Sequence, residues 1–89
     1  MKYHIDTDKA VWRNIEGEIV ILNLESGHYY GLNKTGSLVW VALCEKKDDK
    51  EIADKLCSRY SISRKNAEDD ISTLLETLKK EGLISSMSG

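Results

Sequence analysis

The chain has 89 residues, of which 40% are hydrophobic and 31% are charged, and its net charge is −2. This composition is typical of one small globular domain and excludes a disordered tail. A chain of this length buries only roughly 60–65% of the surface that it exposes when unfolded, which leaves room for a modest core and not for a deep catalytic cleft. The slightly acidic balance gives no general attraction for nucleic acid.

Two features of the sequence indicate the compartment in which the protein is located. No apolar run approaches the ~18 residues needed to span a bilayer, and the start "MKYHIDTDKA" lacks the apolar core of a signal peptide. We therefore expect a cytoplasmic protein that does not contact a membrane. Cys44 and Cys57 each fall in a helical pattern, and in a reducing compartment we expect buried free thiols and no disulfide.

The first third of the chain has the pattern of β-strands. Runs at 10–15 and 18–24 flank Glu16-Gly17, a two-residue hairpin signal. A third run, at 28–32, follows Gly27, which can adopt the left-handed conformation of a tight turn. Short strands joined by tight turns predict an antiparallel meander with its third strand at an edge. That strand contains neither proline nor lysine, so its edge is open to pairing.

The remainder of the chain has a helical period. Asn33, Asp48 and Ser63 are predicted to cap three helices, and Asp48 forms a capping box with Glu51. Gly82 is predicted to terminate the third helix. The expected fold is therefore α+β.

The sequence predicts a single domain over residues 1–89. An N-terminal three-stranded antiparallel sheet, at about 10–32, is followed by a three-helix, winged-helix-like bundle at about 34–81. Residues 85–89 are predicted to be a short frayed tail. The lack of proline is consistent with unkinked helices.

The third predicted helix has an apolar face, an opposite charged face exposed to solvent, and a strip between the two, given about 100° of rotation per residue. One face is an apolar core stripe: Ala67, Ile71, Leu74, Leu75 and Leu78. Beside it lies a strip of short polar side chains, with Leu74 at its border: Asn66, Asp70, Thr73 and Thr77. Such a strip is either an ordinary boundary between core and solvent or a shallow trough. If the trough lies along the open third strand, a peptide can add there as a fourth strand.

Catalytic and metal-binding patterns are not found in the sequence. His4 and His28 have no serine or cysteine partner in a recognisable motif, and there is no phosphate-binding glycine loop. The spacing of these histidines with Cys44 and Cys57 matches no zinc site. We expect a protein that is not an enzyme and holds neither a metal nor a cofactor.

The aromatic residues are expected to pack, with one exception. Trp40 lies in an apolar helical run and is predicted to be in the core, and Trp12 and Tyr60 are predicted to pack as well. Tyr29 and Tyr30 are neighbours on one strand, so their side chains point to opposite faces. One of them therefore faces outward, either as an anchor for a partner or as a half-buried surface residue.

A hairpin followed by three helices also raises the possibility of a winged-helix DNA-binding protein. The charges of the last helix argue against it, because its basic residues lie only at the two ends. The middle is acidic: Glu68, Asp69, Asp70 and Glu76. Acidic groups in a reading helix would repel phosphates, so binding of a peptide or protein is the better prediction.

Three runs of the sequence resemble the PqqD-like family: "GEIVILNLESGHYYGLNKTGSLVW", "EIADKLCSRYSI" and "AEDDISTLLETLKKEGLI". Members of this family are the RiPP recognition elements, which bind the leader segment of ribosomally made precursor peptides. The resemblance covers about Glu18 to Ile84. Within the family, the Gly27–Trp40 segment is most similar to the stand-alone leader-binding proteins of lasso-peptide pathways.

This resemblance implies that a leader peptide is added as a strand beside the third strand and is held against the third helix. The predicted peptide-binding residues are His28, Tyr29, Tyr30, Gly31, Leu32, Asp70, Thr73, Leu74 and Thr77. The expected function is a non-catalytic adaptor that presents the precursor to a modifying enzyme, in lasso pathways a leader peptidase and then a cyclase. The alternative within the family is a peptide chaperone for a radical-SAM enzyme. The open edge can also pair two copies of the chain as a homodimer.

Overall fold

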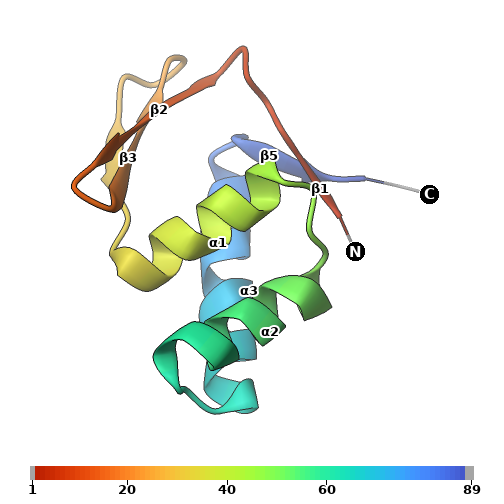
Figure 1. The fold of residues 1–89 in the computed structure, drawn as a ribbon. Helices are drawn as coiled ribbons and strands as arrows, with labels where there is room; N and C mark the ends of the chain where they lie inside the picture. The colour runs from red at the N-terminus through yellow and green to blue at the C-terminus, as the bar shows by residue number, and fades with distance from the viewer. Residues whose placement is uncertain (1, 88–89) are drawn as a thin grey trace.

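The computed structural model describes residues 2–87, and Figure 1 shows their arrangement. The elements in chain order are β1 (Tyr3–Ile5), β2 (Ala10–Ile15), β3 (Glu18–Asn23), β4 (Tyr29–Gly31), α1 (Lys34–Cys44), α2 (Asp49–Tyr60), α3 (Arg64–Lys80) and β5 (Ile84–Ser86). The predicted α+β class is confirmed. One sheet has the order β2-β3-β4 and a second, two-stranded sheet pairs β1 with β5. In Figure 1 the β2–β3 hairpin lies toward the start of α1, and the β1–β5 pair lies toward its end.

The predicted antiparallel meander forms because the residues at its turns can adopt the positive φ angles that tight turns need. Glu16 and Gly17 both have positive φ, 53° and 89°, as a two-residue hairpin between twisted strands requires. Gly27, with φ 80°, closes the turn before β4. Ile21 of the central strand lies opposite Tyr30 of β4. Strand β4 therefore forms one edge of the sheet, as predicted.

The pairing of β1 with β5 was not predicted from the sequence. Ser85 and Ser86 lie in β5, opposite His4 and Tyr3, so the prediction of a frayed tail from residue 85 was wrong. Residues 88–89 of that tail lie outside the described residues. Burial of the Tyr3, Ile5 and Ile84 side chains stabilises this pairing of segments from the two ends of the chain. Three-residue strands are too short to show an alternating pattern in the sequence.

The helix boundaries follow the predicted caps. The Asn33 side chain accepts a hydrogen bond from the Gly36 N–H, and Asp48 and Glu51 form both bonds of the capping box. The Ser63 hydroxyl accepts the N–H of Asn66. Helix α3 ends one residue earlier than predicted, at Lys80. Gly82, with φ 73°, follows its C-cap.

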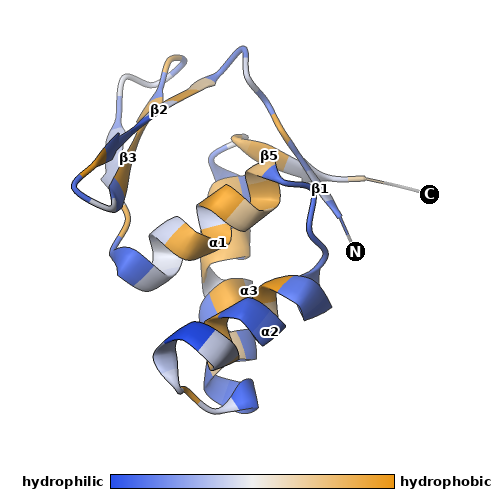
Figure 2. Cartoon of the chain, viewed as in Figure 1, coloured by the Kyte–Doolittle hydropathy of each residue, from blue (hydrophilic) through white to orange (hydrophobic). Residues whose placement is uncertain are grey.

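The core lies where the three helices meet β3 and the β1–β5 sheet. Figure 2 shows hydrophobic segments on α1 and α3 where these helices cross. The largest fully buried side chains are Trp40, Ile21, Leu43, Ile52, Leu56, Leu78, Leu83 and Val39. None of the helices in the described part of the chain is both long and apolar enough to cross a membrane.

The aromatic and cysteine predictions had mixed outcomes. Trp40 is fully buried, as predicted. Trp12 packs edge-on against it with the ring centroids 5.2 Å apart, but its side chain stays 36% exposed. Tyr60 is half-buried against the core. The prediction that Cys44 is buried was wrong, because Cys44 is the last residue of α1 and its side chain is exposed there. Cys57 is partly buried, and both cysteines are free.

A buried serine joins α1 to the sheet. The Ser37 hydroxyl accepts a hydrogen bond from the Ile19 N–H at 2.8 Å and donates one to the Leu32 carbonyl at 3.2 Å. Ser37 thereby replaces the ladder bond by which the Ile19 N–H would reach Leu32 directly. This bridge fixes the end of β4 against the start of α1.

Ser37→Ala is expected to lower the free energy of unfolding by about 1–3 kcal/mol, because it leaves the buried Ile19 N–H without a partner. Urea denaturation measures the change. Ser58→Ala is the matched control, since Ser58 is exposed on α2, and its effect is expected to stay within about 0.5 kcal/mol. Equal effects of the two variants would contradict a structural role for the bridge.

The stability of the fold is expected to depend on pH in the alkaline range because of Tyr3. Burial raises its pKa from an ordinary value of 10.0 to about 12, and the charge and hydrogen bond of Asp49 add to the increase. The folded state thus holds the phenol proton more tightly than the unfolded chain does. Stability that is complete below pH 10 is expected to fall between about pH 10 and 12. In Tyr3→Phe this fall is expected to be shallower by urea denaturation at stepped pH, and an unchanged slope would contradict the assignment.

Candidate peptide-binding groove

Among the residues that the structure describes, the backbone of β4 is paired on one side only, with β3. The Leu32 N–H donates to the Ile19 carbonyl at 2.8 Å, and the His28 carbonyl accepts the Asn23 N–H at 2.9 Å. Residues that face the partner strand alternate along an antiparallel pair, so position 30 belongs to the same set. The N–H and C=O groups of Tyr29 and Gly31 therefore point away from β3. They form the open edge of the sheet.

The side chains of β4 divide between the two faces of the sheet. Tyr30 lies opposite Ile21, which is fully buried, and packs against the core. The nearby Glu81 carboxylate raises the pKa of the Tyr30 phenol, chiefly by a side-chain hydrogen bond. Tyr29 is on the other face and is 71% exposed. The exposed His28 ring stands edge-on to Tyr30, with the centroids 6.4 Å apart.

A groove of about 370 Å³ lies between the end of β4 and helix α3, and we call it the β4–α3 groove. Its walls come from β4, α1, α2 and α3. The lining residues are Gly31, Leu32, Asn33, Thr35, Gly36, Val39, Leu56, Asp70, Thr73, Leu74 and Thr77. Strand β4 packs on β3, whereas α3 packs on the other two helices and on β5. The groove is therefore the space between two elements that are held apart.

The structure brings together most of the residues predicted to bind a peptide. Those that line the groove are Gly31, Leu32, Asp70, Thr73, Leu74 and Thr77. His28, Tyr29 and Tyr30 lie on β4 or directly before it but do not line the groove. The trough expected along α3 is thus present in the structure and begins at the C-terminal end of β4.

Sequence reasoning missed the contribution of α1 and α2. The missed lining residues are Asn33, Thr35, Gly36, Val39 and Leu56. A signal for part of this set was available, because Thr35 and Gly36 put small side chains in the first turn of a helix that directly follows β4. Asn33 was recognised only as a helix cap.

The groove combines an apolar floor with polar walls. Val39 and Leu56 are buried, and Leu74 is half-buried beside them. Thr73 and Asp70 are exposed on the α3 side. No cluster of three or more potential metal ligands occurs within residues 2–87. An open backbone edge next to an apolar floor is the combination that β-strand addition requires.

Comparison with solved structures gives two close matches, which cover all or nearly all of the chain. One is the protein in "TbiB1 in Complex with the TbiA(beta) Leader Peptide", with 36% sequence identity, a TM-score of 0.85 and complete coverage of both chains. The other is the protein in "Lasso peptide synthetase B1 complexed with the leader peptide", with 27% identity and a TM-score of 0.84. That match covers 97% of this chain and all of the other.

A search of the curated proteins gives no match to the chain at a significant level. A comparison with family models, in contrast, agrees with the structural matches. The family model described as "Coenzyme PQQ synthesis protein D (PqqD)" matches residues 18–84, which include β3, β4 and all three helices. The chain therefore belongs to the PqqD family.

Proposed function

We propose that this protein is a non-catalytic adaptor that binds the leader segment of a ribosomally made precursor peptide. The observation that carries the proposal is the position of the open Tyr29 and Gly31 backbone beside the β4–α3 groove. Two proteins of the same fold, one of them 36% identical, have structures described as complexes with leader peptides. These matches support a leader as the occupant of the groove.

Strand addition explains how the site would hold a leader without reading every residue. The leader backbone would pair with the N–H and C=O groups of Tyr29 and Gly31, as a fourth strand. Every second leader side chain would then face the groove and contact Leu74 on its apolar floor. Asp70 would offer a polar contact at the rim. Affinity would come from the backbone, and sequence preference would come from the groove.

The bound leader would raise the effective concentration of the core peptide at an enzyme that modifies it. We propose that this enzyme is a leader peptidase of a lasso-peptide pathway, followed by a cyclase. Similarity to a lasso peptide synthetase B1 favours this pathway over a radical-SAM enzyme. The protein itself supplies binding and no chemistry.

The proposal is tested by fluorescence anisotropy with a labelled leader peptide, for which the TbiA(beta) leader named with the 36% identical protein is the available probe. A labelled random DNA duplex is titrated in parallel. We expect saturable binding of the leader and none of the duplex. Salt-sensitive binding of the duplex alone would contradict the proposal and would favour the winged-helix alternative.

Gly31→Pro is expected to weaken leader binding by roughly tenfold or more, because it removes an N–H that points to the open edge. Proline is tolerated on an edge strand, so the fold is expected to survive. Gly31→Ala is the matched control, since an added Cβ there meets no atom within 4 Å. A leader affinity that Gly31→Pro leaves unchanged would show that the leader does not pair at this position.

A further inference from the structure

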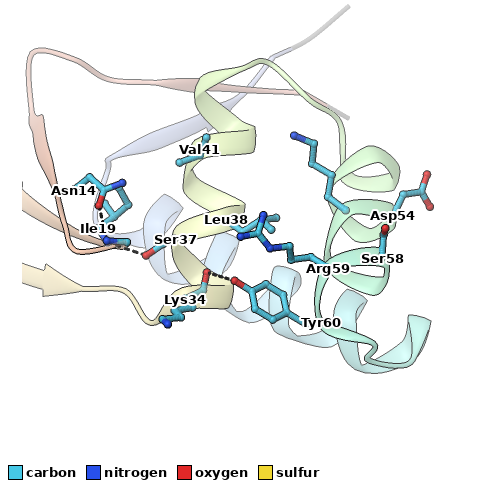
Figure 3. Close-up of a pocket in the computed structure, with 12 residues that line it drawn as sticks. Asn14, Ile19, Lys34, Ser37, Leu38, Val41, Asp54, Ser58, Arg59 and Tyr60 are labelled. Carbon is cyan, nitrogen blue, oxygen red and sulfur yellow. Dashed lines mark hydrogen bonds between the residues drawn. The ribbon is translucent and has the colours of Figure 1, made fainter.

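A second groove, larger than the first, lies between the β2–β3 hairpin and helices α1 and α2. We call it the α1–α2 groove, and its volume is about 830 Å³. The lining residues that matter below are Lys34, Leu38, Val41, Arg59 and Tyr60. Figure 3 shows Leu38 of α1 next to Arg59 of α2, whereas the Ser37 side chain points toward Ile19 of β3. None of these residues lines the β4–α3 groove.

Helix α1 separates the two grooves. The residues that α1 gives to the α1–α2 groove are spaced as one helical stripe: Lys34, Ser37, Leu38 and Val41. Thr35, Gly36 and Val39 line the β4–α3 groove. Because the two stripes occupy different faces of one helix, the grooves can be filled at the same time.

The charges of the α1–α2 groove are not balanced. Asp54 pairs with Arg64, and Lys55 pairs with Glu45, so these two side chains are neutralised. The remaining cations of the groove are Lys34 and Arg59, and neither forms an ion pair within residues 2–87. The groove therefore presents two uncompensated positive charges on a protein whose net charge is −2.

The same groove also has apolar lining residues on α1. Leu38 is half-buried against the core. Val41, on the same stripe of α1, is 42% exposed to the groove. Tyr60 closes the end of the groove near the Lys34 carbonyl, with its hydroxyl 3.5 Å from that oxygen (Figure 3). Carboxylates flanked by aliphatic side chains complement this combination of cations and apolar floor.

We propose that the α1–α2 groove binds a segment of the enzyme to which the leader is presented, and that this segment combines acidic residues with leucines. This inference rests on the proposed adaptor function, because an adaptor needs a second surface that stays free when the leader is bound. A polyanion is a poorer occupant. Two cations on an acidic protein give little of the phosphate neutralisation on which nucleic-acid affinity depends.

The test is an NMR titration of the isotope-labelled protein with a synthetic hexapeptide of sequence LEELEE, alone and with the leader already bound. The expected result is saturable shifts of backbone amides confined to the α1–α2 groove, such as those of Lys34, Leu38 and Arg59. Hexapeptides LQQLQQ and LKKLKK are expected to give no saturable shifts. Shifts that are equal for all three peptides, or absent at about 2 mM LEELEE, where a millimolar site is well occupied, would overturn the proposal.

Charge reversal provides the matched variants. Arg59→Glu and Lys34→Glu are each expected to weaken LEELEE binding about tenfold. Lys50→Glu makes the same change on α2 at an exposed position outside the groove and is expected to have no effect. An equal loss of LEELEE affinity in all three variants would mean that only the net charge of the protein matters. It would overturn the α1–α2 groove as the binding site.

Leader titrations on the same samples separate the two proposals. Leader binding without LEELEE binding overturns the second groove alone. If the unaltered protein does not bind the leader, the adaptor function is overturned, and the proposal for the second groove falls with it. A short DNA duplex that shifts the groove amides more strongly than LEELEE would show that the groove takes a polyanion instead.

Discussion

Leu74→Asp is expected to weaken leader binding by about thirtyfold or more. Leu74 lies half-buried in the β4–α3 groove, where leader side chains would contact it. An aspartate there would have to lose its water when the leader covers it, and none of the described residues that line the groove is a cation that could compensate. A loss of about 2 kcal/mol corresponds to a factor of about thirty in the dissociation constant. Fluorescence anisotropy with the labelled leader measures it.

Two controls make the Leu74 result specific. Ser72→Asp adds the same charge to α3 at an exposed position outside the groove and is expected to leave leader affinity unchanged. Leu74→Met keeps an apolar side chain of similar volume and is expected to change affinity only slightly. Circular dichroism confirms that each variant is folded. Equal affinities of Leu74→Asp and Ser72→Asp would exclude the groove as the leader site.

Trp40→Ala is expected to lower the free energy of unfolding by about 3–5 kcal/mol. Trp40 has no exposed surface, and it fills the centre of the core where Trp12 meets it edge-on. A domain of this size has a total stability of the same order as the loss, so much of the variant is expected to be unfolded at 25 °C. Urea denaturation, or the fraction folded by NMR, measures the change.

Trp40→Phe is the informative companion to this variant. The indole Nε1–H of Trp40 has no hydrogen-bond partner among the described residues, so the packing of its ring has to account for its contribution. Phenylalanine keeps much of the ring and removes the unpaired donor, and its cost is expected to be less than half that of Trp40→Ala. Equal costs of the two variants would contradict packing of the ring as the source of the contribution of Trp40.

Local signals in the sequence predicted the framework of the fold. Asn33, Asp48 and Ser63 cap the helices as expected, because a cap depends only on residues within the next turn. The Glu16-Gly17 hairpin was predictable for the same reason. The β1–β5 pair was not, since it joins three-residue segments from opposite ends of the chain.

The candidate site was predictable to the extent that it depends on one element. Thr73, Leu74 and Thr77 could be placed on one strip of α3 from the helical period alone. Val39 and Leu56 could not be placed in the same groove, because that depends on how α1 and α2 pack against α3. The bonding pattern of β4 also had to be seen. It selects Tyr29 and Gly31 from the five predicted strand residues as those with free backbone groups.

Hydrogen exchange of the β4 amides, measured by NMR with and without the leader peptide, tests the central claim most directly. Backbone pairing with the leader is expected to slow exchange of the Tyr29 and Gly31 amides by about tenfold or more. The Leu32 amide already donates to Ile19 and serves as the internal reference. Protection at Tyr29 and Gly31 on leader binding is the result that strand addition predicts. Leader binding that leaves both amides exchanging as in the free protein would contradict it.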